Sequence, residues 1–163
     1  MENWSDMKNK KMKTGVSEFE MVTAIVQFLK KDKYEVFIEV PSMGQSVDIV
    51  AKRGRYLSFI EAKIVSWKRG LEQCNPHQIV ADYVYIAIAT KKISDTLYNQ
   101  AKDLGYGIIH YDIKTESVDS ILKPKLNKHI WPPQRQHLNS KIKEIKKLGK
   151  NESTALDDIR HIC

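Results

Sequence analysis

The feature that most constrains the fold is an unbroken apolar run from Tyr83 to Ala89, which is rich in β-branched and aromatic side chains. Its seven residues fall far short of the roughly 20 that a membrane-spanning helix needs. A short run of this kind is typical of a central strand that is covered on both faces. With 163 residues, the chain is long enough to build one such core, but not two.

The segments on either side of this run predict further helices and strands. Apolar residues at spacings of three and four predict helices, short β-type runs predict strands, and Pro41 is expected to end the first strand. The order α-β-β-β-α-β-α-β favours a mixed α/β fold, with an antiparallel hairpin sheet, parallel crossovers and helices on both faces. The expected helices are 17–31, 67–74, 94–104 and 134–148, and the expected strands are 34–40, 47–52, 56–63, 83–90, 107–111 and an edge strand within 112–122.

The cysteine content and the N-terminal sequence indicate the compartment. Cys74 and Cys163 are the two cysteines and no CxxC pair occurs, so neither a disulfide framework nor a structural zinc site is expected. The first residues lack the apolar core of a signal peptide. We therefore expect a cytoplasmic protein that is neither secreted nor inserted in a membrane. It should have a flexible tail over 1–13, a folded domain over 14–122 and a basic helical segment over 123–163.

The net charge of +7 is concentrated near the C-terminus. Residues 1–120 hold 17 basic and 16 acidic side chains, whereas residues 121–163 hold 10 basic and 4 acidic ones. Clustered lysine and arginine raise the local potential and release counterions when they bind phosphate groups. A polyanionic partner is therefore the simplest explanation, and a solubilising tail is the alternative.

Three polar residues gather on the hairpin predicted for 47–63. Side chains alternate along a strand, so Glu61 and Lys63 share one face at its end. An antiparallel pair that turns near Gly54 brings Asp48 opposite Glu61. Two carboxylates suit Mg²⁺, which takes waters and phosphate oxygens as its other ligands. Lys63 then lies where it can orient a water nucleophile and stabilise charge on a reacting phosphate.

The stretch 47–51 followed by 59–63 resembles the PD-(D/E)XK nuclease superfamily, whose motif is an acidic residue, a hairpin turn and then Glu/Asp-x-Lys. Val47 stands where the motif has proline. The order of elements around the motif also fits, so the resemblance covers about residues 15–111. It implies a restriction-endonuclease-like fold, with a mixed sheet and an α-β-β-β-α-β core, and here a basic C-terminal helical extension. It also implies DNA as partner, Mg²⁺ as cofactor with Mn²⁺ as a substitute, and Asp48, Glu61 and Lys63 as catalytic residues, the two carboxylates binding the metal.

The same resemblance implies roles for two further residues. In many of these nucleases a glutamate of the first helix joins the metal site, and Glu20 lies at that position. Glu20 also suits a helix capping box with Ser17 as N-cap, and the two roles are compatible. A catalytic glutamine often lies on the helix after the lysine strand, which implies Gln73, and a structural hydrogen bond is its alternative. One variant has a tyrosine four residues later, where this chain has His77. The five histidines share no metal-ligand spacing and are treated as incidental.

Basic side chains indicate where DNA would bind. Two of them lie on the short helix after the motif, where they could follow a phosphate backbone. The others lie on the C-terminal helix, opposite an apolar stripe within 138–148 that must pack on the core or on a second subunit in a homodimer. The residues expected to contact DNA are Lys68, Arg69, Arg135, Lys141, Lys143, Lys146 and Lys147.

The leading hypothesis is a Mg²⁺-dependent endonuclease that hydrolyses DNA phosphodiesters with a metal-activated water. A structure-selective Holliday-junction resolvase is one alternative, because the segment from Gly15 to Glu20, the Pro41-Ser42 loop and the motif are also similar to archaeal-type resolvases. A non-catalytic DNA-binding or assembly module on a nuclease fold is the other. The sequence has no GxxxxGK[ST] motif, so no nucleotide cofactor is expected.

Overall fold

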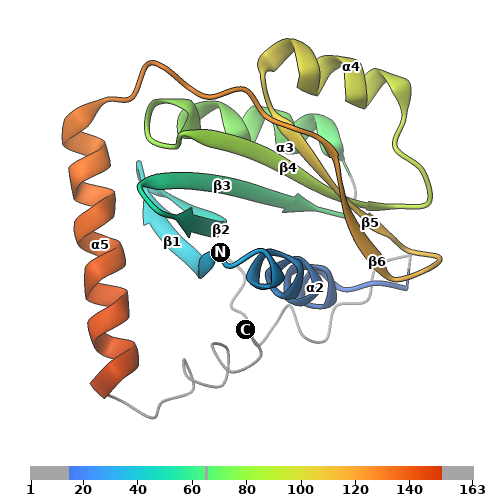
Figure 1. Cartoon of the computed structure of the whole chain (residues 1–163). Coiled ribbons are helices and arrows are strands. Elements are labelled where there is room, and N and C mark those ends of the chain that lie inside the picture. Colours follow the sequence, from blue (N-terminus) through green and yellow to red (C-terminus); the bar gives the residue numbers. More distant parts are fainter. Residues whose placement is uncertain (1–14, 65, 152–163) are drawn as a thin grey trace.

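A single sheet forms the centre of the structure, a computed structural model that describes residues 15–64 and 66–151, with side chains as far as Lys147. The tail predicted over 1–13 lies outside these residues. The sheet has six strands in the order β1-β2-β3-β4-β5-β6, so neighbours in the sheet are also neighbours along the chain (Figure 1). The strands are β1 (Glu35–Ser42), β2 (Gln45–Arg53), β3 (Tyr56–Lys63), β4 (Tyr83–Thr90), β5 (Gly107–Asp112) and β6 (Ser117–Leu122).

Strand directions follow the expected pattern. β1, β2 and β3 pair antiparallel, β3, β4 and β5 pair parallel, and β6 returns antiparallel to β5. The parallel steps require crossovers, which the helices between the strands provide. The mixed α/β fold with its α-β-β-β-α-β core is therefore confirmed.

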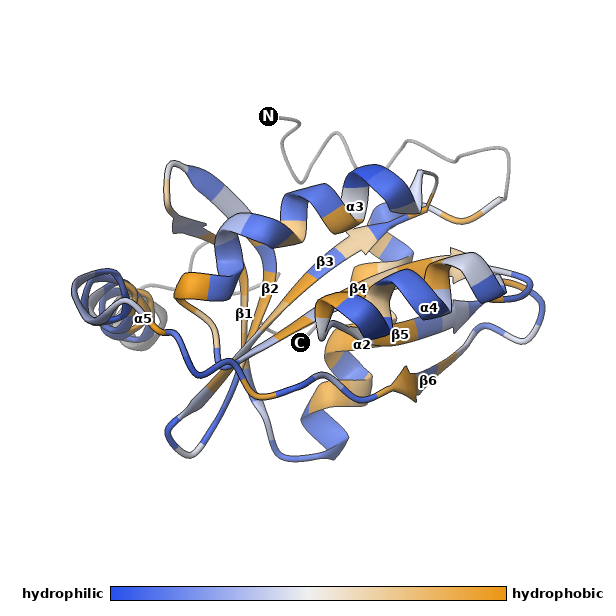
Figure 2. Cartoon of the chain, turned by 90° about the horizontal axis from the view of Figure 1, so that it is seen from above, coloured by the Kyte–Doolittle hydropathy of each residue, from blue (hydrophilic) through white to orange (hydrophobic). Residues whose placement is uncertain are grey.

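Helices cover both faces of the sheet. One face carries α2 (Glu18–Lys31), and the other carries α3 (Trp67–Cys74), the short 3₁₀ helix η1 (Asn75–Ile79) and α4 (Asp95–Leu104) (Figures 1 and 2). In Figure 2 the strands are largely hydrophobic, while the outer surfaces of α3 and α4 carry many hydrophilic residues. The last helix, α5 (Pro132–Asn151), lies beside β1. None of the helices in the described part of the chain is long and apolar enough to cross a membrane.

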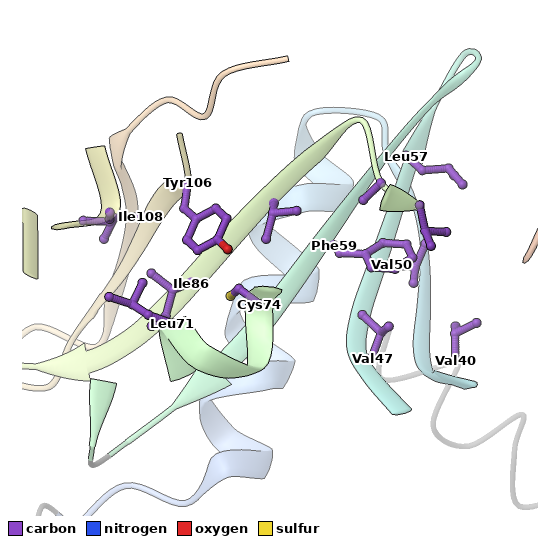
Figure 3. Packing of buried hydrophobic residues seen from close by; sticks show 14 of the residues in the cluster. Val40, Val47, Val50, Leu57, Phe59, Leu71, Cys74, Ile86, Tyr106 and Ile108 are labelled. Carbon is purple, nitrogen blue, oxygen red and sulfur yellow. The ribbon is translucent and has the colours of Figure 1, made fainter. Parts of the chain in front are cut away.

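The prediction that strand 83–90 lies at the centre is confirmed. Val84 and Ile86 of β4 belong to the core under α3 and α4, whereas Ala87 and Ala89 belong to the core under α2. Figure 3 shows Ile86 packed in the first of these cores with Leu71 of α3 nearby. Each core buries a large apolar area, and this burial is the main favourable contribution to folding.

The prediction that Pro41 ends the first strand is wrong. β1 continues through Pro41, which pairs with Ser46 of β2. Proline has no backbone N–H to donate, but β1 is an edge strand of the sheet, where that donor is not needed. The turn comes two residues later at Met43 and Gly44, which both have positive φ, of 52° and 72°, as the tight turns that join hairpin strands require.

Helix α5 packs on the sheet of its own chain. Leu138 and Ile142 are 1% and 2% exposed and belong to the core that also contains Phe37 and Val40 of β1. Lys146 forms an ion pair with Glu35 at the start of β1. Leu138 and Ile142 are therefore not available for the dimer seam that the apolar stripe allowed, and the side chain of Leu148 lies outside the described residues.

Arg135, near the start of α5, is bound inside the protein. Its guanidinium donates hydrogen bonds to the Asp82 carboxylate at 2.7 Å, to the Val80 carbonyl at 2.8 Å and to the Arg55 carbonyl at 3.0 Å. The same carboxylate oxygen of Asp82 accepts a hydrogen bond from the backbone N–H of Leu57. DNA contact by Arg135 stays a prediction, but its donors already join α5, the segment before β4 and the β2–β3 turn.

Replacement of Arg135 by methionine should lower the free energy of unfolding by about 3 kcal/mol, because the half-buried Asp82 carboxylate and two carbonyls lose their donor. Urea unfolding of the full chain measures this change. Lys143→Met is the matched control, because Lys143 is exposed on the same helix, and its effect should stay within about 0.5 kcal/mol. Equal effects of the two substitutions would contradict the role assigned to Arg135.

Candidate functional site

The β2–β3 hairpin brings two carboxylates together. Ile49 pairs with Ile60 in the antiparallel register, so the next positions along the two strands place Asp48 opposite Glu61, as predicted. The backbone N–H of Ala62 donates a 2.9 Å hydrogen bond to Oδ2 of Asp48. Glu61 is only 4% exposed and lies on the face of β3 that α3 covers. The hairpin therefore builds a pair of acidic side chains, in which Glu61 is buried and Asp48 is partly buried.

His77 is the partner of this pair that the sequence did not indicate. It lies in η1, is fully buried, and its Nε2 lies 2.9 Å from Oε1 of Glu61. Burial lowers the pKa of His77 to about 4, so the ring is neutral near pH 7 and donates Nε2–H to the Glu61 carboxylate. Treating His77 as incidental was therefore wrong. The signal was its place four residues after Gln73, where one variant of the superfamily that the sequence resembles has a tyrosine.

Burial and mutual repulsion make the two carboxylates hard to ionise. The pKa of Asp48 is raised to about 7, first by desolvation and next by the neighbouring Glu61. Burial also raises the pKa of Glu61. Two adjacent acids in low dielectric behave as one coupled system, so the pair keeps a proton to higher pH than an ordinary carboxylate does unless a cation replaces that proton.

The hydrogen bonds leave one oxygen of each carboxylate without an N–H donor. Ala62 holds Oδ2 of Asp48, His77 holds Oε1 of Glu61, and the two carboxyl groups also share a hydrogen bond with each other, which a cation bound between them would replace. Hard oxygen donors fit Mg²⁺, which commonly binds one or two carboxylates and completes its shell with water and phosphate oxygens. Across residues 15–64 and 66–151, no group of three or more His, Cys, Asp and Glu side chains is arranged to hold a metal ion. A metal here would thus depend on waters or substrate oxygens.

Lys63 lies two residues beyond Glu61 on the same face of β3. Its side chain passes under α3 at Gly70, where an added Cβ would lie 2.8 Å from Cγ of Lys63 and 2.8 Å from Cδ1 of Ile86. A larger residue at position 70 would therefore displace the lysine or the helix. The absence of a side chain at Gly70 is what allows α3 to lie against the lysine of the motif.

Glu20 forms the capping box that the sequence allowed. Its carboxylate accepts a 2.8 Å hydrogen bond from the N–H of Ser17, and its own N–H donates to Oγ of Ser17 at 3.1 Å. Glu20 also contributes to the electrostatic environment of Tyr111 in β5. The capping role is thus observed, and a role of Glu20 as metal ligand stays a prediction.

Helix α3 places Gln73 and Cys74 beside the sheet. Oε1 of Gln73 is buried and has no hydrogen-bond partner among the described residues. Its catalytic role stays a prediction, and within the described residues Oε1 accepts no hydrogen bond of the structural kind that was the alternative. Burial and the acidic pair raise the pKa of the Cys74 thiol, so this cysteine is a packing residue.

The basic residues predicted to contact DNA differ in their surroundings. Lys68 and Arg69 on α3 are exposed, and Lys143 and Lys147 on α5 are exposed as well. Of the other predicted residues on α5, Lys146 forms an ion pair with Glu35, and Nζ of Lys141 lies 3.8 Å from Oε2 of Glu144. Exposed ion pairs of this kind contribute little and can exchange with phosphate, so DNA binding by these residues stays a prediction.

A hollow that the sequence did not indicate opens where the motif strand ends. Its volume is about 370 Å³, and Ile64 and Ser66, which follow Lys63, form part of its wall. Trp67, Lys91 and Lys92 also line it. Open α/β sheets commonly bind ligands just beyond the carboxyl ends of their parallel strands. The hollow therefore places the ammonium groups of Lys91 and Lys92 and the indole ring of Trp67 on the surface next to Lys63.

Comparison with known proteins gives structural neighbours without a shared family. No protein-family model matches the chain, and no curated protein matches it. A protein of unknown function from Silicibacter pomeroyi covers 79% of this chain and 86% of its own, with a TM-score of 0.59 and 15% identity. Another protein of unknown function covers 58% of both chains, with a TM-score of 0.50 and 18% identity.

Two further neighbours match less closely. An XisH family protein from Nostoc punctiforme has a TM-score of 0.46 and 15% identity over 61% of this chain and 96% of its own. An fdxN element excision controlling factor protein from Anabaena variabilis has a TM-score of 0.45 and 19% identity over 63% of this chain and 95% of its own. At these identities, the first two neighbours show a shared fold and nothing about activity.

Replacement of Asp48 by asparagine should change how stability depends on pH. The ordinary pKa of Asp48 is 3.8 and its folded value is about 7, so between these values the folded protein keeps a proton that the unfolded chain releases. Wild-type stability should therefore fall as the pH rises from about 4 to about 7. In EDTA, Asp48→Asn should be more stable than wild type by about 2–4 kcal/mol at pH 7.5, and the difference should be smallest near pH 4.

Urea unfolding at several pH values measures this difference. Asp119→Asn, at an exposed position on β6, is the matched control and should show no such trend. A difference between Asp48→Asn and wild type that is constant from pH 4 to pH 7.5 would show that Asp48 is already ionised in the folded protein.

Proposed function

We propose that this protein is a metal-dependent nuclease that hydrolyses phosphodiester bonds in DNA. The observation that carries the proposal is the close pair of the partly buried Asp48 and the buried Glu61, which share a hydrogen bond and each have one oxygen held by an N–H donor. Burying two adjacent acids destabilises the folded chain, since each must lose its hydration. A bound cation would remove that cost, so the arrangement is better suited to holding a metal than to stabilising the fold.

The residues near the site would have separate roles in the reaction. Oδ1 of Asp48 and Oε2 of Glu61 would hold Mg²⁺, which supplies an activated water and stabilises negative charge on the phosphate. His77 fixes the orientation of Glu61 through its 2.9 Å hydrogen bond. The Lys63 ammonium, positioned by α3, orients the attacking water and counters charge on the transition state.

Several exposed cations near the site suit a nucleic acid backbone. Lys68 and Arg69 lie on α3, whose Gly70 contacts the Lys63 stem, and Lys91 and Lys92 line the hollow that begins after Lys63. Lysine and arginine bind phosphate oxygens without reading sequence. We therefore propose that the substrate backbone runs along this surface.

Replacement of Lys63 by alanine should abolish cleavage and leave DNA affinity within a few fold, because its ammonium acts on the transition state while other cations hold the backbone. Asp48→Asn and Glu61→Gln should abolish both cleavage and Mg²⁺ binding, since neutral amides bind this cation weakly. Cleavage is measured with Mg²⁺ or with EDTA on supercoiled plasmid, single strands and a four-way junction. Calorimetry measures metal binding.

The controls and substrates separate the alternatives. Lys114→Ala and Asp119→Asn, at exposed positions, should cut as wild type does. Selective cutting of the four-way junction would identify the resolvase-type enzyme. Full Mg²⁺ affinity in both carboxylate variants would place the metal elsewhere, and binding of DNA without any cutting would support the non-catalytic module.

The salt dependence of DNA binding tests the two groups of cations. Two double variants are compared with wild type in EDTA: Lys68→Gln with Arg69→Gln on α3, and Lys143→Gln with Lys147→Gln on α5. Each double variant should reduce the slope of log affinity against log salt by about 0.9 for each phosphate that it no longer binds. Point variants are needed because deleting α5 would remove Leu138 and Ile142 from the core. Lys30→Gln with Lys114→Gln is the control pair. An unchanged slope for the α5 pair would show that this helix only packs against the sheet.

A further inference from the structure

A cavity of about 720 Å³ lies on the opposite face of the sheet from Glu61, between the end of α2 and the starts of β3 and β4. Ser58 at its wall alternates with Phe59 along β3, so the cavity and the acidic pair use different faces and opposite ends of that strand. Its volume falls in the range of roughly 300–1,000 Å³ that is typical of small-molecule sites.

Aromatic rings from separate segments form much of the wall. Tyr34, Tyr56, Tyr83 and Tyr85 all line the cavity. The rings of Tyr56 and Tyr83 lie 5.9 Å apart and are tilted by 49°, so they form two adjoining surfaces. The ring of Tyr85 lies over Gly107, where an added Cβ would approach it to 2.5 Å. Gly107 thus leaves room for this ring beside the cavity.

Three tyrosine hydroxyl groups of the wall lie close together and form no hydrogen bonds with one another. Burial, and next the neighbouring Tyr34 and Tyr83, raise the pKa of Tyr85 to about 12, while nearby Arg53 acts in the opposite direction. Within the described part of the chain, the hydroxyls of Tyr34, Tyr83 and Tyr85 have no hydrogen-bond partner. None of the three is sealed from solvent. These donors and acceptors are therefore available to a bound molecule.

The charge of the wall favours an anion. Arg53 and Lys123 line the cavity, against a single carboxylate from Asp32. The guanidinium of Arg53 lies over the Tyr34 ring, 4.4 Å from its centre, and this stacking leaves its N–H groups free at the edges. Neither Arg53 nor Lys123 forms an ion pair within the described residues.

We propose that this cavity binds a nucleotide, with the base against the tyrosine rings and the phosphate on Arg53 and Lys123. Stacking surfaces beside unpaired cations are what a planar base joined to a phosphate requires. The absence of a GxxxxGK[ST] loop does not bear on this site, because the cavity binds through side chains. The nucleotide is either free or one unit of a single strand, and the proposal does not depend on nuclease activity.

Calorimetry of the full chain in EDTA tests the proposal with deoxyadenosine monophosphate, deoxyadenosine and inorganic phosphate. The monophosphate should bind at least tenfold more tightly than either of its parts. Arg53→Gln, Lys123→Gln and Tyr56→Leu should each weaken this binding at least tenfold. Lys125→Gln is the matched control, because Lys125 lies two residues from Lys123 and lines a different hollow, and it should bind as wild type does.

A second measurement uses the wild-type chain, so it holds even if a variant fails to fold. The monophosphate should slow acetylation of Lys123 and leave that of Lys125 unchanged. A single-stranded oligonucleotide of about eight residues distinguishes the source, since tighter binding than the monophosphate, abolished in Arg53→Gln, identifies a strand. The proposal is overturned if the monophosphate does not bind at about 10 mM, binds no better than phosphate, or binds equally to the Arg53 and Lys123 variants.

Discussion

The burial of β3 on both faces is the constraint on which the rest of the structure depends. A strand in this position excludes water from the side chains between its two ends, so a charge there must find partners within the protein. Leu57 and Phe59 fill the core under α3, and Glu61 continues the same row. His77 and the backbone of Ala62 supply the hydrogen bonds that this environment demands. The acidic pair is thus a product of the same burial that stabilises the sheet.

Much of the fold followed from local patterns. The apolar run over 83–90, the helix signals over 17–31 and the Gly54 turn each depend on residues close together in the chain, and the structure has these elements. The same is true of Asp48 opposite Glu61, since a short antiparallel hairpin fixes its own register. The error at Pro41 had a different origin. Whether proline ends a strand depends on whether that strand lies at the edge of the sheet, and this is not a local property.

The features that the sequence did not reveal all arise from distant contacts. His77 reaches Glu61 across 16 positions, and Arg135 reaches Asp82 across 53. Both residues have ordinary neighbours in the sequence, and only the packing of η1 and α5 gives them partners. The tyrosine cavity likewise combines side chains from five strands, the end of α2 and the segment after β6. A charge pattern predicts that a lysine or arginine is exposed, but it cannot show which one is already bound.

The sequential strand order has a consequence for how the chain folds. Because each strand pairs with the strand before it, the sheet can grow from β1 to β6 as the chain leaves the ribosome, with one turn or one helical crossover to close at each step. Helix α5 is the exception, since it comes last and packs on β1, the first strand. Until α5 is synthesised, the apolar surface of β1 around Phe37 and Val40 stays uncovered. The nascent protein is therefore most prone to aggregation just before α5 docks.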